Sequence, residues 1–286
     1  MNDYTLLDDL CTAWRYPGGE VGVRATAPFV PPPAVLARIQ DSDALVKLLM
    51  YLATTGGAVQ RVCIPYLPYA RQDRIATQGD PVAIDVLAQM LATSGVRRFA
   101  TLEAHSPASI AAFTAAGCEL ANLPATPWIA RFLAALQLRD DRPLWFVAPD
   151  KGARPRTEAH AQVLATTARP IGVIHCTKVR DPITGKLTHF EVDPQNRPNE
   201  LGEHAAVVVV DDICDGGGTF LGVAKALRQT FGNHDLHLWT THGIYSRGLA
   251  DLTNSFSTLG STDSFLHGRA HERLITIPLQ TQHSPR

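Results

Sequence analysis

The segment 207–219 constrains the fold of this chain more than any other. It opens with four consecutive valines, Val207 to Val210, an apolar run of strand length that is typical of a parallel sheet covered on both faces. Asp211 and Asp212 follow directly. Because ligands of open α/β sheets bind beyond the carboxyl ends of the strands, the sequence places two carboxylates where a ligand is expected.

The residues after the acidic pair predict a loop that can hold a phosphate. Asp215 is followed by Gly216, Gly217, Gly218 and Thr219, and then by a helical pattern over residues 220–230. Glycines allow the backbone to approach an anion closely, and the N–H groups of the following helix face it. We therefore expect a cradle for a sugar phosphate, with two carboxylates beside it.

Other glycine-rich loops fit this segment poorly. A dinucleotide loop needs a third glycine where Leu221 stands, and the chain contains no G-x-x-x-x-G-K-[ST] motif. A structural role as a helix cap accounts for one aspartate but leaves the second and the glycine triplet unexplained.

The segment resembles the ribose 5-phosphate binding motif of type I phosphoribosyltransferases and of synthetases of 5-phosphoribosyl 1-diphosphate (PRPP). In that motif a hydrophobic strand precedes Asp-Asp, two variable residues and Asp-Thr-Gly-Gly-Thr. This chain differs at Gly216, where the family has Thr.

A second segment, Pro-Tyr-Leu-Pro-Tyr-Ala-Arg-Gln-Asp-Arg at residues 65–74, separates the two classes. It is similar to the segment that lines the ATP site of PRPP synthetases, and ordinary phosphoribosyltransferases lack it. Arg71 and Arg74 supply charge for a polyphosphate, and Gln72 supplies hydrogen bonds for a base. A solvated charge cluster is the alternative interpretation, which the proline and tyrosine framing disfavours.

The resemblance extends to the N-terminal turn. It implies that Tyr16 stacks on the nucleotide base and that Glu20 belongs to the same ATP site. Gly18 replaces an Asp that reads the adenine amino group in the family, so base selectivity stays open.

Three residues are candidates for a metal site. Glu103 and His105 lie two apart at the end of the expected strand 98–102, so the two side chains can face the same side. By resemblance His105 helps to hold Mg²⁺, Asp150 is a second metal-linked acid, and Glu103 is a conservative replacement. A lone His in this position would more often be a structural hydrogen bonder.

Lys178 and Arg180 follow the expected strand 171–175 and begin a polar segment that extends to residue 203 and has the composition of a mobile loop. In PRPP synthetases a Lys-Arg-Arg segment starts the catalytic flexible loop. The resemblance assigns Lys178 and Arg180 to the transferring phosphates.

Composition sets outer bounds. The length of 286 residues favours two domains over one. The formal net charge of −1 gives no reason to expect nucleic acid or an anionic membrane as a partner. Its acidic N-terminus and its lack of a long apolar run suggest a cytoplasmic protein, and five scattered cysteines suggest reduced thiols.

The resemblance implies an α/β fold of two tandem phosphoribosyltransferase-like domains with largely parallel sheets, residues 1–141 and 142–286. The family forms dimers and hexamers, so we expect at least a homodimer, with an active site where the halves and a neighbouring subunit meet. The implied reaction transfers the β,γ-diphosphate of ATP, with Mg²⁺, to the C1 hydroxyl of ribose 5-phosphate and releases AMP.

The sequence leaves open both the acceptor substrate and the class of protein. Gly216 removes a hydroxyl donor and the volume of a side chain, so the acceptor is either ribose 5-phosphate or a larger 5-phosphate-substituted ribose such as ADP-ribose, which would serve NAD salvage. The alternatives are a phosphoribosyltransferase that uses PRPP as donor and a non-catalytic regulatory homologue.

Overall fold

The structure of the protein, a computed structural model, describes residues 1–139, 141–180, 187–265, 268 and 270–280. The chain forms two compact units. The first contains Met1–Pro124 and short segments that begin at Ser264 and Leu279, and the second contains Ala125–Asp263 and a segment that ends at Pro278. Within the described residues no helix combines the length and the apolar composition needed to cross a membrane.

The first unit contains a parallel five-stranded sheet in the order β1-β4-β5-β6-β7. A two-stranded antiparallel ribbon, β2 and β3, joins β1 to β4. The strands are β1 (Thr5–Leu6), β2 (Cys11–Arg15), β3 (Val21–Ala25), β4 (Ala34–Leu36), β5 (Arg61–Cys63), β6 (Arg98–Leu102) and β7 (Glu119–Leu123). The helices are α1 (Leu7–Leu10), α2 (Ser42–Thr54), α3 (Ala83–Ala92) and α4 (Pro107–Ala115).

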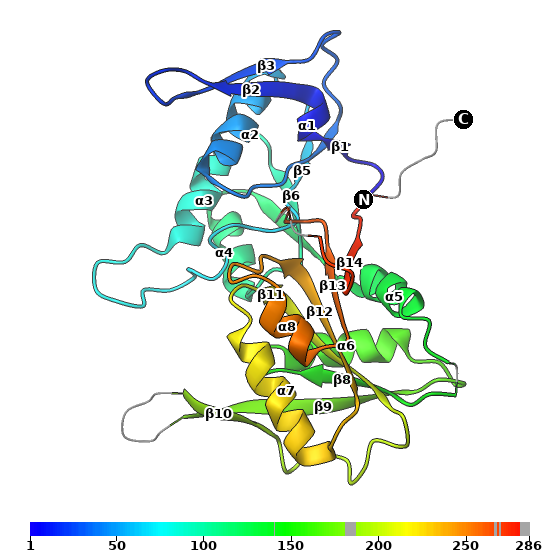
Figure 1. The fold of residues 1–286 in the computed structure, drawn as a ribbon. Coiled ribbons are helices and arrows are strands. Elements are labelled where there is room, and N and C mark those ends of the chain that lie inside the picture. Colours follow the sequence, from blue (N-terminus) through cyan, green and yellow to red (C-terminus); the bar gives the residue numbers. More distant parts are fainter. Residues whose placement is uncertain (140, 181–186, 266–267, 269, 281–286) are drawn as a thin grey trace, which may run out of the picture. The chain divides into compact units, whose positions relative to one another are not determined.

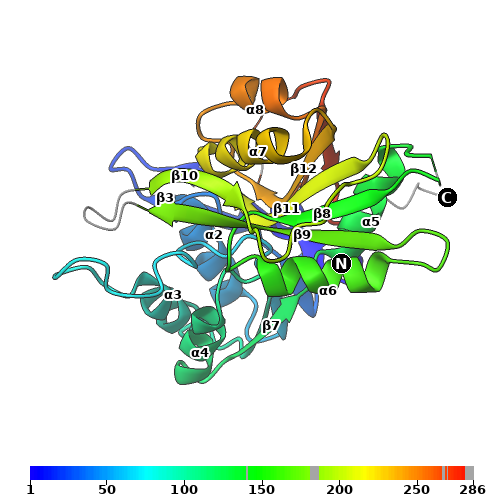
Figure 2. The same ribbon diagram turned by 90° about the horizontal axis from the view of Figure 1, so that it is seen from below.

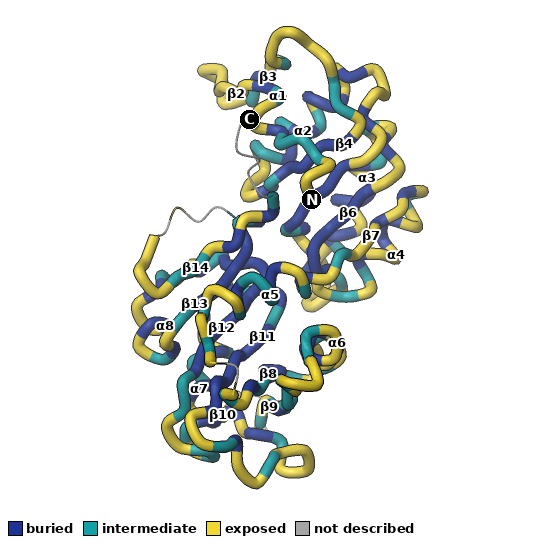
Figure 3. Tube along the Cα trace, turned by 90° about the vertical axis from the view of Figure 1, so that its right-hand side faces the viewer, coloured by how far each residue is buried: buried dark blue, intermediate teal, exposed yellow. Residues whose placement is uncertain are grey.

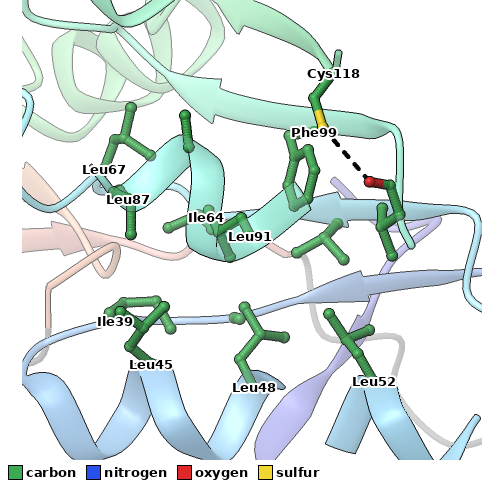
Figure 4. Close-up of a cluster of buried hydrophobic side chains, with 14 of the residues drawn as sticks. Ile39, Leu45, Leu48, Leu52, Ile64, Leu67, Leu87, Leu91, Phe99 and Cys118 are labelled. Atoms are coloured by element: carbon green, nitrogen blue, oxygen red, sulfur yellow. Dashed lines mark hydrogen bonds between the residues drawn. The ribbon is translucent and has the colours of Figure 1, made fainter. Parts of the chain in front are cut away.

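The helices α2, α3 and α4 cover one face of this sheet (Figure 1). From β4 to β7 the strand order advances in one direction, and right-handed crossovers then place every connecting helix on the same side. The leucines of α2 and α3 pack with Phe99 of β6 in a single buried cluster (Figure 4). Asp41 caps α2, because its carboxylate accepts a hydrogen bond from the Ala44 N–H at 2.8 Å.

The second unit contains a seven-stranded sheet in the order β10-β9-β8-β11-β12-β13-β14, parallel except for β10. The strands are β8 (Leu144–Ala148), β9 (Ile171–Arg180), β10 (Leu187–Val192), β11 (Ala206–Cys214), β12 (Asp235–Gly243), β13 (Thr258–Thr262) and β14 (Leu274–Ile277). The helices are α5 (Thr126–Ala135), α6 (Arg154–Leu164), α7 (Gly218–Phe231) and α8 (Ala250–Ser255).

This sheet is covered on both faces. The helices α7 and α8 lie on one face and α6 lies on the other (Figure 2). The valine run of β11 is at most 1% exposed, and Figure 3 shows β11 as buried for most of its length. The predicted buried parallel strand and the helix after it are therefore confirmed, as is the α/β fold class with largely parallel sheets.

Two predicted boundaries differ from the structure. The polar segment after Arg180 was expected to be a loop, but Leu187–Val192 forms β10 and pairs with β9. The expected domain boundary after residue 141 places α5 in the first domain. In the structure α5 belongs to the second unit, which begins at Ala125. Trp128 and Arg131 of α5 both donate hydrogen bonds to the Pro278 carbonyl, at 3.2 and 2.9 Å, and Phe132 packs on Trp239.

We predict that Leu48→Ala lowers the free energy of unfolding by about 2 to 5 kcal/mol, because it leaves a cavity in the α2 cluster. Leu48 is fully buried, whereas Met50 on the same helix is 42% exposed, so Met50→Ala is the matched control and should cost about 0.5 kcal/mol or less. Urea unfolding measures both variants. Equal losses would show that the cluster does not hold the first unit together.

Candidate functional site

The second sheet has a topological switch point between β8 and β11. From β8 the chain crosses through α6 to β9 on one side, and from β11 it crosses through α7 to β12 on the other. The ladder between β8 and β11 ends at the pair Val147 and Val209, while β11 continues beside β12 as far as Cys214. The residues after Val209 therefore flank the position where α/β sheets bind ligands.

Asp211 and Asp212 lie at this switch point, held by one arginine. Arg156, in the first turns of α6, approaches an Asp211 carboxylate oxygen at 2.8 Å and an Asp212 carboxylate oxygen at 3.1 Å. Both aspartates belong to β11, which runs four residues beyond the predicted strand end at Val210. Pairing with β12 explains the extension, because it fixes the backbone of this stretch.

The surroundings of Asp211 favour its neutral form. Burial and the neighbouring charge of Asp212 raise the pKa of Asp211 well above its usual value, and the Arg156 guanidinium only partly offsets them. Arg156 thus faces both carboxylates, and Asp212 is only 3% exposed. A ligand that donates hydroxyl hydrogen bonds would relieve this arrangement without adding charge.

Arg156 is a site residue that the sequence reasoning missed. The signal was available, because Arg156 lies in the first turns of the helix that follows β8, and β8 and β11 are neighbours. What the sequence lacked was the strand order that brings that helix beside the acidic pair.

The glycine loop forms the turn into α7. Gly217 adopts a left-handed φ of +80° at the helix N-cap, and the helical ladder starts with Phe220 and Leu221, which donate to its carbonyl at 3.0 and 3.1 Å. The N–H groups of Gly218 and Thr219 precede that ladder and lie at the positive end of the helix. Asp215 accepts a hydrogen bond from the Ser246 hydroxyl at 2.6 Å, which ties the loop to the segment after β12.

Lys178 of β9 and Asp150, two residues beyond the end of β8, form an ion pair, with Nζ 2.6 Å from a carboxylate oxygen. The other oxygen accepts from the Gly152 and Ala153 N–H groups at 3.0 and 3.2 Å. Burial opposes ionisation of Asp150, but the Lys178 ammonium and these N–H groups outweigh it and lower its pKa. The side chain of Arg180, predicted as the partner of Lys178, lies outside the described residues.

In the first unit, Tyr16 and Glu20 flank a tight turn between β2 and β3. The Tyr16 N–H donates to the Glu20 carbonyl at 2.9 Å. The exposed Tyr16 ring makes an edge-to-face contact with the Trp14 ring, with 5.7 Å between the ring centroids. The Glu20 carboxylate curls over Gly18, with an oxygen 2.6 Å from where a Cβ of residue 18 would lie. The carboxylate expected at position 18 is therefore replaced in space by that of Glu20.

The Arg71–Arg74 segment and the segment around His105 meet within the first unit. Asp73 accepts a hydrogen bond from the Ser106 hydroxyl at 2.7 Å, which joins the two segments. Arg71, Gln72 and Arg74 are exposed. Asp73, which carried no predicted role, therefore positions the exposed residues on either side of it.

Glu103 and His105 lie beyond the regular part of the strand that precedes them. Strand β6 ends at Leu102, and Glu103 adopts a left-handed φ of +49°, so the alternation of side chains stops there. Glu103 is 4% exposed, whereas His105 is exposed. These two residues belong to the first unit and Asp150 to the second. The described residues contain no group of three or more His, Cys, Asp or Glu side chains that could hold a metal by themselves.

We predict that Arg156→Gln lowers stability by on the order of 3 kcal/mol at neutral pH, because two carboxylates are then left without their cation. Because the pKa of Asp211 is raised in the folded protein, this group stabilises the fold fully at pH values below its ordinary pKa of 3.8. That stabilisation is lost as pH rises through the pKa of Asp211 in the folded protein. The variant raises that folded pKa further, so its deficit should be constant at low pH and should grow as pH rises beyond the folded pKa of Asp211 in wild type.

Thermal unfolding across pH measures this deficit, with Arg154→Gln as the control. Arg154 lies on the same helix but pairs with Asp193, at 2.9 Å, whose pKa is lowered. The loss of stability in Arg154→Gln should stay constant at pH values above 3.8, the ordinary pKa of an aspartate. Parallel curves for the two variants would contradict the assignment of Arg156.

Comparisons with known proteins agree with this arrangement. The model of the phosphoribosyl transferase domain matches residues 119–232, and that of the N-terminal domain of ribose phosphate pyrophosphokinase matches residues 35–95. A solved structure, the phosphoribosylpyrophosphate synthetase from Mycobacterium smegmatis, matches with a TM-score of 0.72 at 20% identity, and covers 94% of this chain and 86% of its own. This structural similarity shows that the chain has the same fold as that protein.

Sequence relatives carry the family assignment. The ribose-phosphate pyrophosphokinase of Granulibacter bethesdensis is 32% identical over 79% of this chain and 68% of its own length. The corresponding proteins of Methanosarcina mazei and Mycoplasmopsis pulmonis are 30% and 27% identical, over 84% and 76% of this chain and 75% and 64% of their own lengths. The chain is therefore a transferase enzyme of the ribose-phosphate pyrophosphokinase family.

Proposed function

We propose that this enzyme transfers the β,γ-diphosphate of ATP to the C1 hydroxyl of a ribose 5-phosphate unit and releases AMP. The observation that carries the proposal is the Asp211, Asp212 and Arg156 cluster at the switch point, next to the glycine loop at the start of α7. The cluster matches the hydroxyls of a ribose, and the loop matches its phosphate.

In this proposal Asp211 and Asp212 accept hydrogen bonds from the 2- and 3-hydroxyls of the sugar. A carboxylate accepts such bonds more strongly than a neutral oxygen does. Arg156 fixes both carboxylates before the sugar arrives. Asp215 and the residues Gly216, Gly217, Gly218 and Thr219 receive the 5-phosphate through backbone N–H groups and the threonine hydroxyl.

In the transfer step the C1 oxygen forms a bond to the β-phosphorus while the bond to the oxygen that bridges the α- and β-phosphates breaks. AMP leaves with that electron pair, and the hydroxyl proton passes to water. Phosphoryl transfer depends mainly on alignment and on stabilisation of developing charge. Lys178, and Arg180 by its place in the sequence, would supply positive charge to the transferring phosphates.

Mg²⁺ is the cofactor proposed for this reaction. Asp150 suits it, because its lowered pKa keeps it ionised and two N–H groups orient it. Mg²⁺ usually binds through one or two carboxylates and the substrate phosphates, so a single protein carboxylate such as that of Asp150 is enough to begin such a site. His105, and Glu103 more weakly because it is buried, are the other candidate ligands. When bound, the ion neutralises phosphate charge.

ATP is assigned to residues of the first unit. Arg71 and Arg74 would bind its phosphates, Gln72 would bind the base, and Tyr16 would stack on the base. The position of the Glu20 carboxylate over Gly18 supports a role for Glu20 in reading the adenine amino group. We also propose a cytoplasmic homo-oligomer, at least a dimer, without a nucleic-acid or membrane partner.

The acceptor is either ribose 5-phosphate, which gives PRPP, or a 5-phosphate-substituted ribose such as ADP-ribose, whose product would serve NAD salvage. Gly216 leaves the larger acceptor open, because position 216 itself offers no hydroxyl donor to a dianionic monoester. The family name of the relatives favours the smaller one.

We predict AMP release that requires both Mg²⁺ and an acceptor, and a comparison of kcat/KM for ribose 5-phosphate and ADP-ribose selects between the two. AMP is measured by mass spectrometry. Absence of AMP with both acceptors would reject the proposed reaction, and PRPP consumption with a free base would instead indicate a phosphoribosyltransferase.

Lys178→Ala should lower AMP release by about 100-fold or more while ATP binding is nearly unchanged, because its charge acts mainly as the phosphates transfer. Lys225, exposed on α7, is the control, and Lys225→Ala should behave as wild type. Weaker ATP binding with unchanged turnover would contradict the role given to Lys178.

A further inference from the structure

The space that a side chain at position 216 would fill is not empty. A Cβ built on Gly216 would lie 3.3 Å from Nε of Arg247, 3.4 Å from its Cδ and 3.7 Å from its Cγ. Arg247 comes from the segment that follows β12. Its side chain thus lies along the glycine loop, on the side where the family's threonine would project.

Backbone and side-chain hydrogen bonds fix this placement. The N–H groups of Ile244 and Tyr245 donate to the Cys214 carbonyl at 2.9 and 3.0 Å, and the Ser246 N–H donates to the Asp215 carbonyl at 3.1 Å. The Ser246 hydroxyl adds a bond to the Asp215 carboxylate. The residue next in sequence, Arg247, is therefore held beside the loop by its neighbours and not by its own side chain.

The guanidinium of Arg247 is available to a ligand. The residue is exposed, and the described part of the chain offers it no hydrogen bond or ion pair. Its planar group presents several N–H donors that match two phosphate oxygens at once, whereas a threonine hydroxyl presents one. A cation here also adds to the field of the α7 N-terminus.

We propose that Arg247 is an acceptor-binding residue that binds the phosphate on C5 of the acceptor, in the place that Gly216 leaves. The inference rests on the proposed function, because it concerns the acceptor of that reaction. The ligand chemistry is a phosphate attached to C5 of a ribose. It is present in both ribose 5-phosphate and ADP-ribose, and Arg247 contributes to the affinity of whichever is bound.

The first test measures acceptor binding by calorimetry without ATP, and KM and kcat for AMP release, in wild type, Arg247→Ala and Arg247→Lys. We expect Arg247→Ala to raise Kd and KM for the preferred acceptor about 10-fold, with KM for ATP unchanged and kcat nearly unchanged. The lysine variant should recover part of the loss. Arg139→Ala removes an exposed arginine that precedes β8 and should leave all constants as in wild type.

The second test exchanges the two positions. Gly216→Thr alone forces its side chain against Arg247 and should weaken acceptor binding. The double variant Gly216→Thr, Arg247→Gly removes that contact and offers a hydroxyl donor, so it should bind the acceptor better than the Gly216→Thr variant. Additive effects would show that the two positions do not share one space.

The outcomes separate this inference from the proposed function. Acceptor binding that weakens in Arg247→Ala supports the inference even if no AMP forms, in which case only the reaction is rejected. AMP release with unchanged acceptor constants in Arg247→Ala overturns the inference alone. Failure of wild type to bind either acceptor, or an equal rise of KM for ATP, also overturns it.

Discussion

The site depends on one guanidinium shared by two carboxylates. Asp211 and Asp212 follow a fully buried valine run, and without Arg156 their mutual repulsion would oppose the strand geometry that places them there. Arg156 can reach them because the ladder between β8 and β11 ends at Val209 and because α6 covers the same side of the switch point. The strand order therefore determines the electrostatics of the site, because it places the Arg156 guanidinium beside the two carboxylates.

The sequence predicted much of the fold and part of this site. The valine run, the glycine triplet and the helix pattern after it carry their own local signals, because strand, turn and helix have different periodicities. It could not predict Arg156, since contact between α6 and β11 depends on strand order. It also missed the extension of β11 to Cys214 and the strand β10, because pairing with a neighbour overrides the polar composition of those stretches.

Two glycines that depart from the family pattern share a structural explanation. Beside Gly18 lies the carboxylate of Glu20, and beside Gly216 lies the side chain of Arg247. In each case a neighbouring residue occupies the volume that the missing side chain would have filled. At Gly18 the replacement has the same charge as the expected Asp, whereas at Gly216 a cation stands in for a neutral hydroxyl. Comparison of aligned positions records both as losses, while the arrangement in space places a charged side chain beside each glycine.

The length of β9 bears on how Lys178 can act. Lys178 was expected at the root of a mobile loop, but it pairs with Phe190 in the β9 and β10 ladder, and Asp150 holds its ammonium group. Fixing the backbone of a flexible residue costs about 1 to 2 kcal/mol in conformational entropy. At Lys178 that ordering is already complete before any substrate arrives, so only the side chain has to exchange one anion for another. The backbone of Lys178 is thus ordered by the sheet, and in the proposed reaction the binding of a phosphate to this lysine would not include the entropic cost of closing a loop at that residue.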